Sequence, residues 1–168
     1  SLLNMHYSAF VGLADNLGLG KIKTIGDAYM VAAGLPIPRE DHVEAIAEMA
    51  LAMLSATSVI QTKAGEDLEI RIGINTGVVV AGVIGTKKFI YDMWGDAVNI
   101  ASRMESSSKP GKIQVTAATY EKLKDEYVLE RRGLVPVKGR GEMETYWLEA
   151  RRPEKQAQPQ LEPLAKAN

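Results

Sequence analysis

The spacing of apolar residues alternates between helical and strand periods along the chain, and each change predicts a new element. Helical spacing occurs at 2–17, at 41–54 after the capping pattern D-x-x-E, at 96–104 and at 117–123. Alternating or short apolar runs predict strands at 21–25, 28–33, 68–74 continuing through N-T-G into 78–83, 89–94, 113–116, 128–137 and 143–148. This order of helices and strands is typical of an α+β fold.

The helical pattern is already under way at Ser1, so we expect the chain to be a truncated piece whose first strand is missing. With a strand supplied before Ser1, the elements make a ferredoxin-like βαββαβ-type sheet with helices and an added C-terminal hairpin. Residues 1–150 then form one domain that is incomplete at its N-terminus. Residues 151–168 are rich in Pro, Gln and charge without periodicity, which predicts a disordered tail or linker.

The predicted helix at 96–104 separates polar from apolar residues most clearly. At 100° per residue, Asp96, Asn99 and Arg103 share one stripe, and Ala97, Ala101 and Met104 share a neighbouring stripe. The apolar stripe is expected to pack, and the polar one offers an amide beside a guanidinium. A solvated helix face and a binding face both fit this pattern.

Two predicted hairpin turns also carry charge. Asp27 stands in the Gly26-Asp27 turn with Lys23 on the preceding strand, and Lys138 and Arg140 stand in the closing turn. Asp is a common turn former, and charges on turns are usually solvated. The pattern of residues alone therefore predicts no reaction.

Composition removes several classes of function. The chain has 168 residues, of which 46% are hydrophobic and 24% charged, so it can form a real core. Its net charge of −1, with both signs interspersed, gives no reason to propose a nucleic-acid or anionic-membrane partner. Its apolar runs are too short to insert into a bilayer, and the absence of cysteine excludes thiol chemistry.

Four sequence blocks occur in a diagnostic order: KIKTIGDAYM, INTGVVVAGVIG, YDMWGDAVNIASRM and VKGRG. Together they resemble the catalytic domain of class III nucleotidyl cyclases, the adenylyl and guanylyl cyclases, over roughly residues 2–148. In that family two catalytic domains pair head to tail, and the active sites lie in the cleft between them. The resemblance implies attack of a ribose 3′-hydroxyl on the α-phosphate of a nucleoside triphosphate, which releases pyrophosphate.

The resemblance also implies roles for residues that bind the nucleotide. Lys23 and Asp92 match the pair that selects the base, and this pair suits adenine, because guanylyl cyclases usually carry Glu and Cys there. Lys138 matches the lysine that reaches the triphosphate. ATP is therefore the expected substrate, and Arg140 is a weaker candidate for the phosphates.

Catalytic and metal roles follow from the same comparison. Asn99 and Arg103 resemble the pair that orients the ribose and stabilises charge on the α-phosphoryl group. Asp27 resembles the second of two aspartates that hold two Mg²⁺ or Mn²⁺ ions, whose preferred ligands are oxygens. The phrase that carries the first aspartate in the family, F-x-D-[IV]-x-G-F, has no match before Lys21.

A chain that carries both kinds of site residue implies a symmetric homodimer with two equivalent sites. The family also implies a cytoplasmic catalytic domain attached to regulatory domains. Two other interpretations stay open: a non-catalytic cyclase-homology module for nucleotide binding or dimerisation, and a guanylate cyclase.

Overall fold

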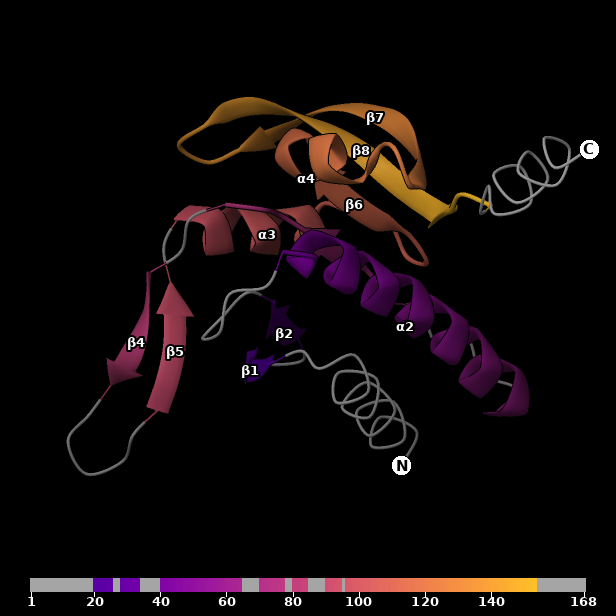
Figure 1. Ribbon diagram of the computed structural model, residues 1–168, viewed down its shortest axis with the longest axis horizontal. Helices are drawn as coiled ribbons and strands as arrows, with labels where there is room; N and C mark the ends of the chain where they lie inside the picture. Colours follow the sequence, from indigo (N-terminus) through magenta and orange to yellow (C-terminus); the bar gives the residue numbers. More distant parts are fainter. Residues whose placement is uncertain are drawn as a thin grey trace, which may run out of the picture.

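The computed structural model of the chain describes residues 20–25, 28–33, 40–64, 70–77, 80–84, 90–94 and 96–153 (Figure 1). Its elements are β1 (Gly20–Ile25), β2 (Ala28–Ala32), α2 (His42–Ala64), β3 (Ile72–Ile74), β4 (Val80–Ile84), β5 (Ile90–Trp94), α3 (Asp96–Ser106), β6 (Ile113–Thr116), α4 (Ala117–Leu123), β7 (Tyr127–Val137) and β8 (Gly141–Arg151). This order confirms the predicted α+β class. The helix predicted at 2–17 and the tail beyond Pro153 lie outside the described residues.

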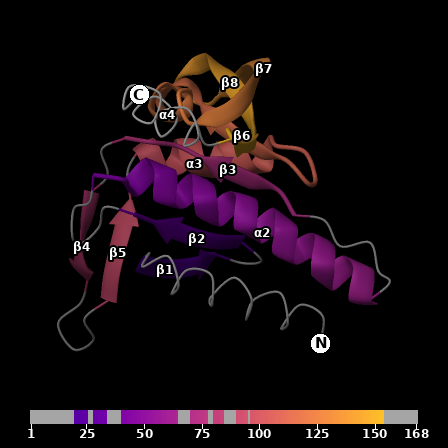
Figure 2. The same cartoon turned by 45° about the vertical axis from the view of Figure 1, so that its right-hand side comes forward.

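Strand pairing among the described residues forms one four-stranded sheet and two hairpins. The sheet has the order β3-β6-β8-β7, in which β3 and β6 are parallel and the other neighbours are antiparallel. β1 pairs with β2, and β4 pairs with β5, both in antiparallel fashion. The β4–β5 hairpin projects away from the four-stranded sheet in both views (Figures 1 and 2). Helix α3 connects this hairpin to the sheet.

Helix α2 is longer than its apolar pattern predicts, because it continues from 54 to Ala64. The polar residues after Leu54 obscure the pattern, yet they fit the helix. Thr57 shows how: its Oγ1 donates to the carbonyl of Met53 at 2.8 Å, one turn earlier. No helix in the described residues is both long and apolar enough to cross a lipid bilayer.

Strand β3 is shorter than predicted. Ile70 and Arg71 lie outside it, and the expected continuation through N-T-G is wrong, because 75–77 has no strand structure. The backbone oxygen of Ile70 instead accepts a hydrogen bond from Gly111 N at 2.7 Å, in the loop before β6. Polar side chains at 75 and 76 take up other contacts, which are described below.

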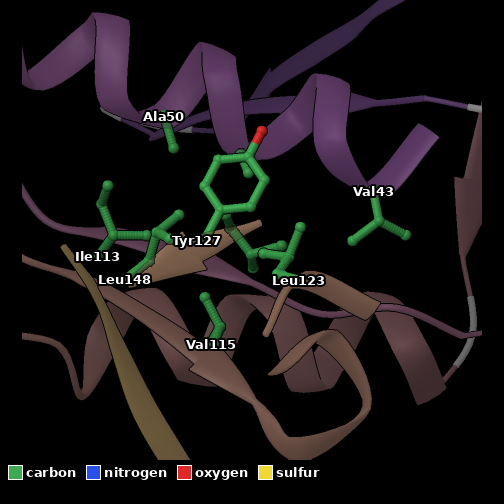
Figure 3. Packing of buried hydrophobic residues seen from close by; sticks show 9 residues of the cluster. Val43, Ala50, Ile113, Val115, Leu123, Tyr127 and Leu148 are labelled. Carbon is green, nitrogen blue, oxygen red and sulfur yellow. The ribbon is translucent and has the colours of Figure 1, made fainter. Parts of the chain in front are cut away.

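The main core lies between α2 and the sheet. It combines Val43, Ala47 and Ala50 of α2 with Ile74, Ile113, Val115, Leu123, Tyr127 and Leu148 (Figure 3). The Tyr127 ring is fully buried, and its hydroxyl points toward α2, where it donates to Glu48 Oε2 at 2.5 Å. Burial and this hydrogen bond raise the pKa of Tyr127 well above its ordinary value.

Helix α3 lies directly against β3. An added Cβ at Gly73 would overlap the backbone nitrogen of Glu105 and would lie 2.7 Å from Met104 Cβ. Only glycine therefore permits this approach. Met104 of the predicted apolar stripe is buried, whereas Ala97 and Ala101 are half-buried. Ile100, which the predicted stripe did not include, is buried as well.

The closing hairpin is longer than its predicted arms. β7 starts at Tyr127, and β8 runs from Gly141 to Arg151, one residue past the predicted end of the domain. Gly139 and Gly141 have φ of +80° and +68°, which L side chains rarely adopt, so the turn between the arms requires glycine at both positions. Helix α4 has the predicted bounds.

Candidate functional site

Several predicted site residues come together where α3 meets the turn of the β7–β8 hairpin. Asp96, Asn99 and Arg103 are all exposed on α3, so the predicted polar stripe faces away from the core. Arg103 and Lys138 line one hollow of about 540 Å³, together with Pro136, Val137, Gly139, Gly141 and Glu142. Residues from two separate sequence blocks thus come together in one place.

The side chain of Arg103 is fixed at one end. Its Nε donates to the carbonyl oxygen of Pro136 at 3.0 Å. Within the described part of the chain, its two Nη groups have no hydrogen-bond partner. A guanidinium carries five N–H donors, so the group can be held by Nε and still offer both Nη groups to an oxyanion.

The turn itself is tied to the start of α3. Arg140 forms an ion pair with Asp96, and each side chain is about half exposed, at 53% and 51%. Solvent screens such a pair, so its contribution to stability is modest, but it keeps the turn close to α3. The guanidinium of Arg140 is engaged here, whereas the Lys138 side chain is exposed.

The N-terminal part of α3 is held by a group of polar residues that the sequence pattern did not single out. Asn75 Nδ2 donates to the carbonyl of Ala97 at 3.0 Å, and Thr116 Oγ1 donates to Asn75 Oδ1 at 2.7 Å. Thr76 and Thr119 share a hydrogen bond of 2.9 Å beside them. A polar Asn-Thr pair directly after a half-buried strand is the signal that could have revealed this contact.

The other predicted site residues are less fully described. Lys23 lies in β1, where its backbone pairs with Met30, and Asp92 lies in β5 opposite Gly82. Their side chains and all of Asp27 lie outside the described part of the chain. Among the described residues there is no group of three or more His, Asp or Glu placed to hold a metal ion. The metal and base roles therefore remain predictions.

Comparison with known proteins identifies the family. Residues 1–150 match the model of the adenylate and guanylate cyclase catalytic domain, and the chain belongs to this family. The fold agrees with the crystal structure of the adenylyl cyclase CyaB from P. aeruginosa. That structure is 31% identical, with a TM-score of 0.85 over 90% of this chain and 82% of that chain.

Curated relatives bear both family names. An adenylate cyclase of Mycobacterium tuberculosis is 50% identical over 150 residues, which cover 89% of this chain and 34% of that protein. The receptor-type guanylate cyclase gcy-28 of Caenorhabditis elegans is 49% identical over 152 residues, covering 88% of this chain and 12% of that protein. The chain spans about a third of the length of the first relative and less of the second.

Proposed function

We propose that this chain is the catalytic domain of an adenylate cyclase, which converts ATP to 3′,5′-cyclic AMP and pyrophosphate. The observation that carries the proposal is the meeting of Arg103 and Lys138 at one hollow, beside the stripe that bears Asn99. Family membership supplies the reaction class, and the 50% identity to a protein named adenylate cyclase supports ATP as substrate.

The residues of the hollow suit the charge changes of this reaction. As the 3′-oxygen attacks and pyrophosphate leaves, negative charge builds on the phosphoryl oxygens and on the leaving group. In our proposal the free Nη groups of Arg103 stabilise that charge at the α-phosphoryl group, and Lys138 binds the triphosphate. The amide of Asn99 orients the ribose, so that the 3′-hydroxyl faces the phosphorus.

Selection of adenine is assigned to Lys23 and Asp92. Lysine donates to adenine N1 and aspartate accepts from the 6-amino group, whereas guanine presents the opposite edge. Exchange to Glu at 23 and Cys at 92 is therefore expected to move the preference from ATP toward GTP. The 49% identity to a guanylate cyclase makes GTP the specific alternative, so both nucleotides belong in every assay.

Divalent ions are part of the proposal. Asp27 would serve as one carboxylate ligand for Mg²⁺ or Mn²⁺, which favour oxygen ligands. Such ions, when bound, neutralise phosphate charge and activate an attacking oxygen. Asp27 stands between β1 and β2 in the sequence, close to Lys23.

The complete site is proposed to form between two copies of the chain, arranged head to tail. A single chain that carries the base, metal, ribose and phosphate residues can build two equivalent sites across a twofold axis. We also propose that regulatory domains of the whole protein control this pairing. With ATP as the proposed substrate, we also propose that the domain is cytoplasmic.

The test is direct. The purified full-length protein is incubated with ATP or GTP and with MgCl₂ or MnCl₂, and the products are separated and identified by mass spectrometry. We expect cyclic AMP from ATP, with Arg103→Ala as the strongly impaired control. Preferred conversion of GTP would identify a guanylate cyclase, and nucleotide binding without any cyclic product would identify a non-catalytic module.

A further inference from the structure

A polar side chain lies at the centre of the contact between α3 and the sheet. Gln114 of β6 has no exposed surface, although its neighbours Ile113 and Val115 are apolar core residues. A buried amide is costly unless its donors and acceptor are satisfied. Here they are: Nε2 donates to Met104 O at 2.9 Å and to Ser107 Oγ at 2.8 Å.

The chain of hydrogen bonds continues from Gln114 to the backbone of Arg103. Ser107 Oγ, which accepts from Gln114, donates in turn to the carbonyl oxygen of Arg103 at 2.6 Å. The backbone N–H of Ser107 donates to the same oxygen at 2.9 Å. Ser107 therefore links the buried amide to the residue whose side chain lines the hollow.

Arg132 of β7 completes the network on the other side. Its Nη1 donates to Gln114 Oε1 and to the carbonyl of Ser107, both at 2.5 Å. The guanidinium lies over the Trp147 ring, with Cζ 4.7 Å from the ring centroid, so its plane is held by a second strand. A cation at this position also complements the negative end of the α3 dipole.

Strand β7 is linked by hydrogen bonds to both the backbone and the side chain of Arg103. Arg132 reaches the Arg103 backbone through Gln114 and Ser107, and Pro136, four residues along β7, accepts from Arg103 Nε. We propose that Gln114, Ser107 and Arg132 are positioning residues, which set the place of the Arg103 guanidinium without contacting the nucleotide. This inference rests on the proposed function.

A shift of an ångström is enough to weaken a group that acts on a transition state, because its benefit depends on pre-set geometry. The apolar residues Ile100 and Met104 fix α3 against the sheet but define its axial position less strictly than directional hydrogen bonds do. Loss of the network should therefore change turnover more than substrate binding.

Two serines provide a matched pair of variants. Ser106 Oγ also donates to the Arg103 carbonyl, at 3.3 Å, but among the described residues it forms no hydrogen bond with Gln114 or Arg132. We expect Ser107→Ala to lower kcat about fivefold, with KM for ATP changed by less than about twofold. Ser106→Ala should stay within about twofold of wild type in kcat and KM, and Ser107→Thr, which keeps the hydroxyl, should restore kcat.

A double-mutant cycle in the full-length protein tests whether Ser107 affects kcat through Arg103. If Ser107 acts through Arg103, adding Ser107→Ala to Arg103→Ala should cause no further loss of kcat. Arg132→Met, which keeps an apolar side chain but has no donor for the two acceptors, should lower kcat in the same way. Melting temperatures are recorded for every variant, so that turnover is compared only among folded proteins.

The proposal is overturned if Ser107→Ala and Ser106→Ala behave alike, or if the Ser107 and Arg103 losses multiply in the cycle. Its failure differs from failure of the proposed function. If wild type makes no cyclic nucleotide, both are wrong, whereas an active wild type with an impaired Arg103→Ala leaves the proposed function intact.

Discussion

At the scale of single residues, different atoms of Arg103 fix the residue in place and face the hollow. Its Nε is bound to Pro136 O, and its carbonyl accepts from Ser106 and Ser107. The end of the side chain remains available at the hollow that it shares with Lys138. This division is the property expected of a group that must meet developing charge without first reorganising.

Substitution of Arg103 should show whether its side chain acts on the transition state or on the bound substrate. We expect Arg103→Ala to reduce kcat by roughly 10²-fold or more while KM for ATP changes little, because the lost contact is strongest in the transition state. Arg103→Lys keeps the charge but loses the planar fork, so its kcat should lie between wild type and Arg103→Ala. Steady-state kinetics with ATP measures both. Equal changes in kcat and KM would assign Arg103 to ground-state binding instead.

Tyr127 predicts a dependence of stability on pH. Its pKa is raised in the folded protein above the ordinary value of 10.0, first by burial and then by the hydrogen bond to Glu48. The stabilisation is fully present below pH 10.0 and is lost as the pH rises above it, since the unfolded chain then releases this proton more easily. Urea unfolding between about pH 8 and 11 should show a weaker alkaline loss for Tyr127→Phe than for wild type. Identical pH profiles would contradict this assignment.

At the scale of elements, α3 is defined by its contacts with neighbouring strands. Asn75 donates to a carbonyl in its first turn, Gly73 allows its backbone to approach β3, and Gln114 donates to the carbonyl of Met104 in its last turn. The sequence predicted the apolar and polar faces of α3 and the bounds of α4, because these follow from local period. It did not predict these three supports, because each joins residues from separate elements.

A substitution at Gly73 tests most directly how closely α3 packs against β3. Gly73→Ala would place a methyl group onto the Glu105 backbone, so α3 or β3 must move. We expect a loss of about 1–3 kcal/mol in the free energy of unfolding, measured with urea, and a fall in kcat in the folded fraction. Ala at Gly77, where an added Cβ would lie 3.2 Å from Ala97 Cβ, is the milder control. A neutral Gly73→Ala would show that α3 is not held at this distance.

Differences from the predicted elements have a common cause. Helix α2 exceeds its apolar pattern because polar residues such as Thr57 satisfy their hydrogen bonds within the helix. Strand β3 falls short because the backbone at Ile70 pairs with a loop, and because Asn75 turns to α3. Hydrophobic period predicts which face is buried, but tertiary hydrogen bonds decide where an element ends.

At the scale of the whole molecule, the described residues supply one part of the proposed site. Arg103 and Lys138 meet within the chain, and β1 and β5, the strands that carry Lys23 and Asp92, also contact each other. Asp27 is the residue that the proposed arrangement brings to the site of the second copy. The four sequence blocks were sufficient to predict the family, which the match over residues 1–150 confirms. The meeting of α3 with the closing turn required the fold, since 35 positions separate Arg103 from Lys138.

Mixing of inactive variants tests the proposed pairing. In the proposed arrangement one copy supplies Asp27 and the other supplies Asn99 and Arg103. Asp27→Ala and Arg103→Ala proteins, each strongly impaired alone, should therefore regain about a quarter of wild-type activity when allowed to exchange subunits. Half of the dimers are then mixed, and each mixed dimer carries one intact site. A mixture of Arg103→Ala with Asn99→Ala is the matched control, because both changes fall on the same half of a site. Recovery in the control, or none in the test, would contradict the head-to-tail arrangement.

The far end of β8 has a mechanical consequence. Arg151 closes the strand with bonds to Glu48 of α2 and lies over the Tyr127 ring, while Gly141 opens the same strand beside the turn that carries Lys138. A displacement of the polypeptide beyond Pro153 would thus act on the Arg151–Glu48 ion pair before it reached the turn beside Gly141, which lies at the opposite end of the strand.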